Sequence, residues 1–314
     1  MQVPCGAGHG YNFTIETHNI TPSMNTALNR RHFLRLATLA SLCPLSCSRR
    51  EKESEAPLAP PAPPVPRAPS GLRKKGLGFG TKKEGWDTTL TNLRCKWFYS
   101  WTNEVQKTIP EGIDFIPMVF GKWGIKESAA KAAAFAKKIG VREILGYNEP
   151  DESRQANLSV EKALDAWPLL METGLRLGSP SCVHPDREWM KEFMAGVKDR
   201  KLRVDFVCMH SYGGPSPKAL VERIKSIHAM FGKPIWITEF AVGDWEAKSP
   251  EANRHKPERV LKFMEEALPL LNAMDIVERY AWFPARQNDN ALCTSALFDK
   301  DGTLTPLGEC YSKA

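Results

Sequence analysis

Two glutamates each follow a short apolar run that has the pattern of a buried strand. Glu149 lies in REILGYNEPDE, shortly after the apolar run that ends at Leu145, and Glu239 lies in PIWITEFAVG. Parallel α/β folds place their chemistry at the carboxyl ends of such strands. Glutamate is also a poor turn residue that is costly to place near a core, which favours a chemical role for Glu149.

The residues around Glu149 end its strand. Pro150 cannot continue a strand ladder, so the chain must turn there. Asn148 and Asp151 are residue types that are common in turns and helix caps, and for Asp151 we favour that structural role. Asn148 stays a candidate binding residue because it directly precedes the acid.

Polar and aromatic residues also follow the other predicted strands. Aromatic rings stack on the apolar faces of pyranose rings, and a pair of acids can hydrolyse a glycosidic bond, so this set suits a sugar polymer. For each Trp the alternative is ordinary packing, and for His210 the alternative is a hydrogen-bonded core histidine. The candidate binding residues are Asn148, Trp101, Trp123, His210, Tyr212 and Trp282.

The elements that must position these residues alternate between strand and helix patterns. Eight strands with intervening helices over about 240 residues predict an α/β fold, a single-domain (β/α)8 TIM barrel. An open doubly wound sheet is the alternative, but no glycine fingerprint follows the first strand. The predicted strands are 76–80, 96–100, 115–120, 143–147, 176–179, 204–210, 235–240 and 279–283, and the helical patterns are 127–139, 160–173, 186–197, 217–231 and 257–274.

The first 47 residues carry an export pattern. Residues 1–23 show no periodicity, and we interpret them as an extension ahead of a true start at Met24. Residues 24–47 contain paired arginines in NRRHFLRL, followed by the short apolar run ATLASL, which resembles a twin-arginine export signal. This run is too short for an ordinary membrane-spanning helix. We therefore expect an exported protein, periplasmic, secreted or on the cell surface; the alternative is an amphipathic helix of a cytosolic protein.

Two cysteines close to the end of this signal, Cys43 and Cys47, are candidate lipidation sites for a lipid anchor. Residues 48–70 are rich in proline, so they predict an extended linker without a core. Residues 71–314 then form the predicted barrel.

Charge and cysteine spacing exclude several classes of partner. The first 75 residues hold ten Lys/Arg against four Asp/Glu, whereas the remainder holds 33 against 32. The net charge of +7 therefore gives no argument for nucleic acid, and the near-neutral body suits a neutral ligand. The eight cysteines have no zinc-type spacing, so we expect neither a metal nor a cofactor, and we expect a monomer.

Four motifs, in order, resemble glycoside hydrolase family 128: LGYNEPD, DFVCMHSYGG, WITEFAV and DGTLTPLG. The resemblance runs from about Gly76 to Tyr311. It implies a metal-free (β/α)8 enzyme that cleaves β-1,3-glucan internally and retains the anomeric configuration. By the same resemblance, Glu149 is the general acid/base, Glu239 is the nucleophile, and Asn148 binds the sugar 2-hydroxyl.

Three alternatives follow from the same residues. The mechanism could act on another β-linked polysaccharide, such as mannan, xylan or β-1,4-glucan. A non-catalytic glycan-binding surface protein would keep the tryptophans, although the presence of both acids disfavours it. A metal-dependent hydrolase would need a His-x-His at the first strand, and GLGFG has none. Ser211 departs from the fungal members, where an aromatic is expected, so it bears on fine specificity.

Overall fold

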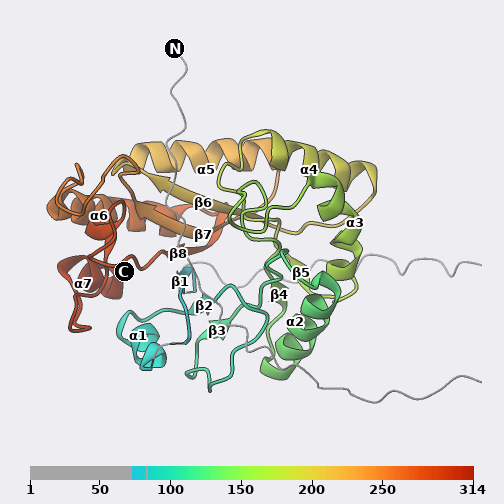
Figure 1. The fold of residues 1–314 in the computed structure, drawn as a ribbon, viewed down its shortest axis with the longest axis horizontal. Coiled ribbons are helices and arrows are strands. Elements are labelled where there is room, and N and C mark those ends of the chain that lie inside the picture. The colour runs from blue at the N-terminus through green and yellow to red at the C-terminus, as the bar shows by residue number, and fades with distance from the viewer. Residues whose placement is uncertain (1–72, 83) are drawn as a thin grey trace, which may run out of the picture. The chain divides into compact units, whose positions relative to one another are not determined.

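The computed structural model describes residues 73–82 and 84–314 (Figure 1). The predicted extension at 1–23, the export signal at 24–47 with Cys43 and Cys47, the linker at 48–70 and the domain start at Gly71 lie outside these residues. Within the described residues, no helix is both long enough and apolar enough to cross a bilayer.

Strands occupy the middle of the described part and helices surround them (Figure 1). The strands are β1 (Lys75–Gly78), β2 (Trp97–Tyr99), β3 (Asp114–Phe115), β4 (Glu143–Ile144), β5 (Arg176–Leu177), β6 (Val207–Gly213), β7 (Ile235–Val242) and β8 (Val277–Trp282). The helices are α1 (Trp86–Asn92), α2 (Ile125–Ile139), α3 (Val160–Met171), α4 (Glu188–Asp199), α5 (Pro217–Phe231), α6 (Pro257–Ala273) and α7 (Pro306–Lys313), with a short 3-10 helix, η1 (Cys293–Ser295).

The strands form two parallel sheets that border one another twice. The larger sheet has the order β3-β2-β1-β8-β7-β6, and β4 pairs with β5 in the smaller one. Isolated parallel bridges link the sheets, between Met118 and Leu145 at one border and, at the other, between Gly178 and Phe206 and between Cys182 and Met209. Pro117 lies beside the first border, where a proline has no N–H to extend a ladder.

This order confirms the predicted single-domain (β/α)8 fold, because each strand lies next to its neighbours in the sequence and β1 pairs with β8. A continuous ladder around the whole barrel is not observed at the β3–β4 and β5–β6 borders of the described residues.

Local sequence signals explain the helix ends. In α2, the alanines at 129, 132 and 136 are buried on one face, and Gly140 ends the helix in the left-handed conformation. In α5, the Ser216 side chain accepts a hydrogen bond from the N–H of Ala219, and Pro217 occupies the first turn. The helices that begin at Val160, Pro217 and Pro257 start where expected, whereas α2 begins at Ile125 and α4 at Glu188, two residues from the predicted starts.

Two buried clusters make up the core. The larger one lies between the strands and the helices, and the smaller one contains Trp97, Tyr99, Ile116, Met118, Leu145, Phe206, Cys208, Trp236 and Ala281. Trp97 and Tyr99 alternate with Phe98, which belongs to the larger cluster. This alternation directs Tyr99 toward the strand-enclosed cluster, directly beneath the carboxyl ends of the strands.

Candidate active site

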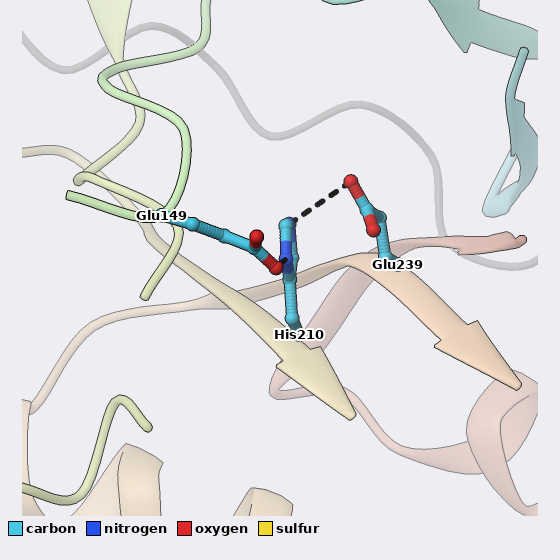
Figure 2. Close-up of side chains that lie close together, drawn as sticks. All are labelled: Glu149, His210 and Glu239. Atoms are coloured by element: carbon cyan, nitrogen blue, oxygen red, sulfur yellow. Dashed lines mark hydrogen bonds and ion pairs between the residues drawn. The ribbon is translucent and has the colours of Figure 1, made fainter. Parts of the chain in front are cut away.

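An irregular register places β6 and β7 side chains opposite one another. Met209 pairs with Ile237, but the next residue, His210, pairs with Glu239 and skips Thr238. A bulge of this kind re-aims a side chain and is common next to active sites. The result is that His210 and Glu239 lie side by side at the carboxyl ends of two buried strands (Figure 2).

Glu149 is positioned by an unusual backbone conformation. Its φ of 42° lies in the left-handed region, which non-glycine residues seldom adopt. The N–H of Glu149 donates to the carbonyl of Ser181 at 2.9 Å, and the N–H of Asn148 donates to the carbonyl of Phe120 at 2.9 Å. The neighbouring strand ends thus hold the strained residue in place, as is common at functional sites.

The imidazole of His210 lies between the two carboxyl groups (Figure 2). Its Nδ1 is hydrogen-bonded to Oε1 of Glu149 at 2.8 Å, and its Nε2 lies at ion-pair distance, 3.4 Å, from Oε1 of Glu239. Burial lowers the pKa of His210, but the charge of Glu239 and the hydrogen bond and charge of Glu149 outweigh burial and raise that pKa above its usual value. The surroundings therefore favour the protonated ring, in which Nδ1 is hydrogen-bonded to Glu149 and Nε2 faces Glu239 without a hydrogen bond among the described residues.

The Glu149 carboxyl is shifted toward its neutral form. Burial raises the pKa of Glu149, and the hydrogen bond and charge of His210 oppose this rise without cancelling it. Because Oε1 accepts from His210, Oε2 is the oxygen that can carry a proton toward a ligand. A carboxylic acid kept neutral by burial is what a general acid requires.

Glu239 has three neutral donors around it. Oε1 accepts from the hydroxyl of Tyr99 at 2.7 Å and from the indole N–H of Trp101 at 2.9 Å, while Oε2 accepts from the hydroxyl of Tyr212. Burial, and then the charge of Glu239, raise the pKa of both tyrosines well above the usual value, so the hydroxyls stay protonated and donate. These contacts suit a carboxylate that acts in its ionised form.

Asn148 presents a buried oxygen without a donor. The side chain is 3% exposed, and its Nδ2 donates to Oε1 of Gln155 at 3.3 Å. Its Oδ1 has no hydrogen-bond partner among the described residues. A buried carbonyl oxygen without a donor costs about 1–3 kcal/mol, which marks Asn148 Oδ1 as a polar group that the described residues do not satisfy.

The three predicted tryptophan platforms have different positions. Trp101 is itself a hydrogen-bond donor to Glu239, and its φ of 57° is also left-handed. Trp123 is 63% exposed and stacks on Phe120 with ring centroids 6.0 Å apart. Its ring lies at the surface of the loop between β3 and α2, with the ammonium of Lys122 5.2 Å from the ring centroid.

The prediction that Trp282 binds sugar is wrong. Its side chain is fully buried, its indole N–H donates to the carbonyl of Ser295 at 2.9 Å, and its ring contacts Phe240. Side chains alternate along β8, so Trp282 points toward the helical layer. The next residue, Phe283, is the one that contacts Trp101 and Tyr212.

Two further residues, Tyr99 and Asp151, support the site. Tyr99 was not among the predicted site residues, although its position two residues after Trp97 on a buried strand was visible in the sequence. Asp151 has the structural role expected for it, since its carboxylate accepts from the N–H groups of Val183 at 3.0 Å and His184 at 3.1 Å. It holds the loop after β5 against the loop after β4.

Glu149, His210 and Glu239 also form the type of cluster that could hold a cation, because each offers one atom within 4.8 Å of the others. Each nitrogen of His210, however, faces a different carboxylate, so the ring already links the two acids. A shared cation would have to replace these contacts.

We therefore expect that dialysis against EDTA leaves the rate of hydrolysis within about twofold of the untreated rate, a change of less than about 0.5 kcal/mol in the barrier. A loss that added Mg²⁺, Ca²⁺ or Mn²⁺ restores would contradict this expectation.

Comparisons with known proteins agree with this geometry. The family model for the glycosyl hydrolase catalytic core matches residues 76–311. A subgroup I endo-β-1,3-glucanase of family GH128 from Amycolatopsis mediterranei, solved with laminaritriose, is 31% identical with a TM-score of 0.66, over 77% of this chain and 99% of that one. The chain belongs to glycoside hydrolase family 128. The resemblance seen in the four sequence motifs is thereby confirmed, and this GH128 protein is a glycoside hydrolase.

Two other relatives of this GH128 chain have different names. A subgroup III curdlan-specific exo-β-1,3-glucanase from Blastomyces gilchristii, solved with glucose, is 27% identical with a TM-score of 0.62, over 78% of this chain and all of that one. Alkali-sensitive linkage protein 1 of Schizosaccharomyces pombe is 30% identical in an alignment of 256 residues that covers 76% of this chain and 44% of the relative. The chain thus spans less than half of that curated relative.

Proposed function

We propose that the protein hydrolyses β-1,3-glucan internally with retention of anomeric configuration, with Glu149 as general acid/base and Glu239 as nucleophile. The observation that carries the proposal is the pair of acids joined by His210, with one oxygen of each carboxyl within 4.8 Å of one oxygen of the other. Retaining pairs are separated by about 5–5.5 Å, whereas inverting pairs lie about 6.5–9.5 Å apart to admit a water. The short distance favours retention.

In the first step, a carboxylate oxygen of Glu239 attacks the anomeric carbon as the glycosidic bond breaks. Oε1 has three protein contacts and Oε2 has one, so Oε2 is the better placed nucleophile. Oε2 of Glu149 gives its proton to the departing oxygen, which leaves as the free hydroxyl of the released chain. The 2-hydroxyl of the sugar donates a hydrogen bond to Oδ1 of Asn148, which has no other donor among the described residues.

In the second step, water replaces the released chain. The Glu149 carboxylate takes a proton from this water, and the oxygen forms the new bond at the anomeric carbon as the bond to Glu239 breaks. Glu239 leaves as a carboxylate, which Tyr99, Trp101 and His210 stabilise at Oε1. Both acids return to their initial protonation states.

The substrate class rests on the similarity to the Amycolatopsis relative, an endo-β-1,3-glucanase solved with laminaritriose. We expect the described domain, expressed with its natural N-terminal residues, to release reducing ends from laminarin at least about tenfold faster than from mannan, xylan or cellulose, a difference of about 1.4 kcal/mol in the barrier. Faster release of reducing ends from mannan, xylan or cellulose would show that this polymer, and not β-1,3-glucan, is the preferred substrate. Binding of laminarin without any release would favour a non-catalytic glycan-binding protein.

Exo-action is the second candidate, because the Blastomyces relative is named an exo-β-1,3-glucanase. The two modes differ in their first products. Internal cleavage lowers the viscosity of a soluble β-1,3-glucan early and yields mixed oligosaccharides, whereas exo-action releases one short sugar from the start. Chromatography of products at low conversion distinguishes them.

A further inference from the structure

Exposed apolar side chains are few in the described residues, and two of them are tryptophans on loops after strands. The strongly exposed large apolar residues there are Trp123, Met230, Trp245 and Leu270. Met230 and Leu270 lie on α5 and α6, in the outer layer of helices. Trp123 was already a predicted sugar platform, so Trp245, in the loop between β7 and α6, is the one that the mechanism above leaves without a role.

Trp245 lies one aromatic ring away from the carboxylate of Glu239. Its indole N–H donates to the backbone carbonyl of Tyr212 at 3.2 Å, and the two rings meet edge to face with centroids 5.8 Å apart. The Tyr212 hydroxyl in turn donates to Glu239. The N–H is the only hydrogen-bond donor of the Trp side chain, so a ligand at Trp245 can be recognised only through the ring.

The loop that carries Trp245 is firmly anchored. The carboxylate of Asp244 is buried and accepts from the N–H of Arg254 at 2.9 Å and from its guanidinium at 2.7 Å. The N–H of Asp244 donates to the carbonyl of Ala291 at 2.9 Å. Trp245 is 43% exposed although its indole N–H is hydrogen-bonded and the preceding residue, Asp244, is held on both its side chain and its N–H. A pre-positioned aromatic surface loses little entropy when it binds a ligand.

A separate hollow follows the acid/base residue in the chain. Its volume is about 590 Å³, and Gly121, Ser159, Trp189 and the two residues after Glu149, Pro150 and Asp151, are among those that line it, whereas neither acid does. Trp245, on the loop after β7, lies on the Glu239 side, because it contacts Tyr212 and the Tyr212 hydroxyl donates to Glu239. A chain cleaved internally must extend on both sides of the acids, and an aromatic ring suits the apolar face of a pyranose.

We propose that the ring of Trp245 binds a glucosyl unit away from the cleavage point, on the Glu239 side of the site. The inference rests on the proposed glucan hydrolase function. It assigns to Trp245 a contribution that depends on substrate length, because only a chain long enough to reach the ring gains from it.

The test compares substrates of different length. We expect Trp245→Ala to lower kcat/KM on laminarihexaose about tenfold, equal to about 1.4 kcal/mol, and to change kcat/KM on the shortest laminari-oligosaccharide that the enzyme cleaves by less than about twofold. Trp245→Phe keeps a ring but loses the N–H, so it should retain most of the preference for length. Leu270→Ala is a matched control, since Leu270 is also 43% exposed but lies on α6.

Each outcome decides the inference. Equal losses on both substrates would mean that Trp245 acts only by holding Tyr212, and no loss on either would mean that the ring binds no sugar; both overturn the inference while the proposed function stands. A wild-type protein that neither binds nor cleaves laminari-oligosaccharides would overturn the inference together with the proposed function. Thermal melting of each variant identifies a loss that comes from unfolding.

Discussion

Replacing Glu239 with alanine is expected to lower glucan hydrolysis by about 10³-fold or more, because no other carboxylate can form the covalent intermediate. The substitution leaves space on the side of the sugar ring that Glu239 occupies. Azide can enter that space and attack the anomeric carbon of a β-glycosyl substrate directly. The product should be the α-glycosyl azide, identified by proton NMR. The exposed Glu192 on α4 offers a control, since Glu192→Ala should leave the rate unchanged.

The corresponding Glu149 variant separates the two roles. Glu149→Ala should lower hydrolysis of natural glucan by about 10²–10⁴-fold, the contribution of a positioned general acid. A substrate with an activated leaving group needs no proton, so it should still form the covalent intermediate with Glu239. Azide then attacks this intermediate from the opposite face and gives the β-azide. Exchanged azide products would reverse the assignments, and an α-anomer released first by the wild type would exclude retention.

The strand ends could be predicted because their signal is local. The apolar runs before Glu149 and Glu239 and the glycine that follows α2 are short-range patterns, and the structure has strands and a helix there. The assignment of the eight strands to one (β/α)8 order follows from their alternation with helices. The alternation of strands and helices does not indicate which side chain at a strand end points into the site. For this reason the sequence led to Trp282, whereas the structure has Phe283 against Tyr212.

The contacts among the acids could not be predicted, because they depend on register. The bulge that skips Thr238 brings His210 opposite Glu239, and nothing in either strand's composition marks it. Likewise, Tyr99 contacts Glu239 across 140 positions of sequence. For His210, the sequence left a core role and a site role open, and the structure combines them, since the ring is 1% exposed and lies between both acids.

That position makes His210 a positioning residue whose loss should change the pH dependence of the rate. Burial raises the pKa of Glu149, and His210 lowers it through a hydrogen bond and a charge. Removing the lowering influence leaves burial unopposed, so the pKa of Glu149 rises further in His210→Ala. On the alkaline side, kcat/KM falls as the general acid Glu149 loses its proton. This alkaline limb of the pH profile should therefore move to higher pH in His210→Ala.

His210→Ala should also lower kcat by about 10²-fold, the smaller end of what a positioned general acid contributes, because the Glu149 carboxyl loses the contact that orients it. Asparagine can place an N–H near the position of Nδ1, which faces Glu149. His210→Asn should therefore recover part of the rate and move the alkaline limb back toward that of the wild type. A rate loss with an unchanged alkaline limb in both variants would show that His210 only fills space between the strands, since packing alone does not alter the ionisation of Glu149 through a hydrogen bond.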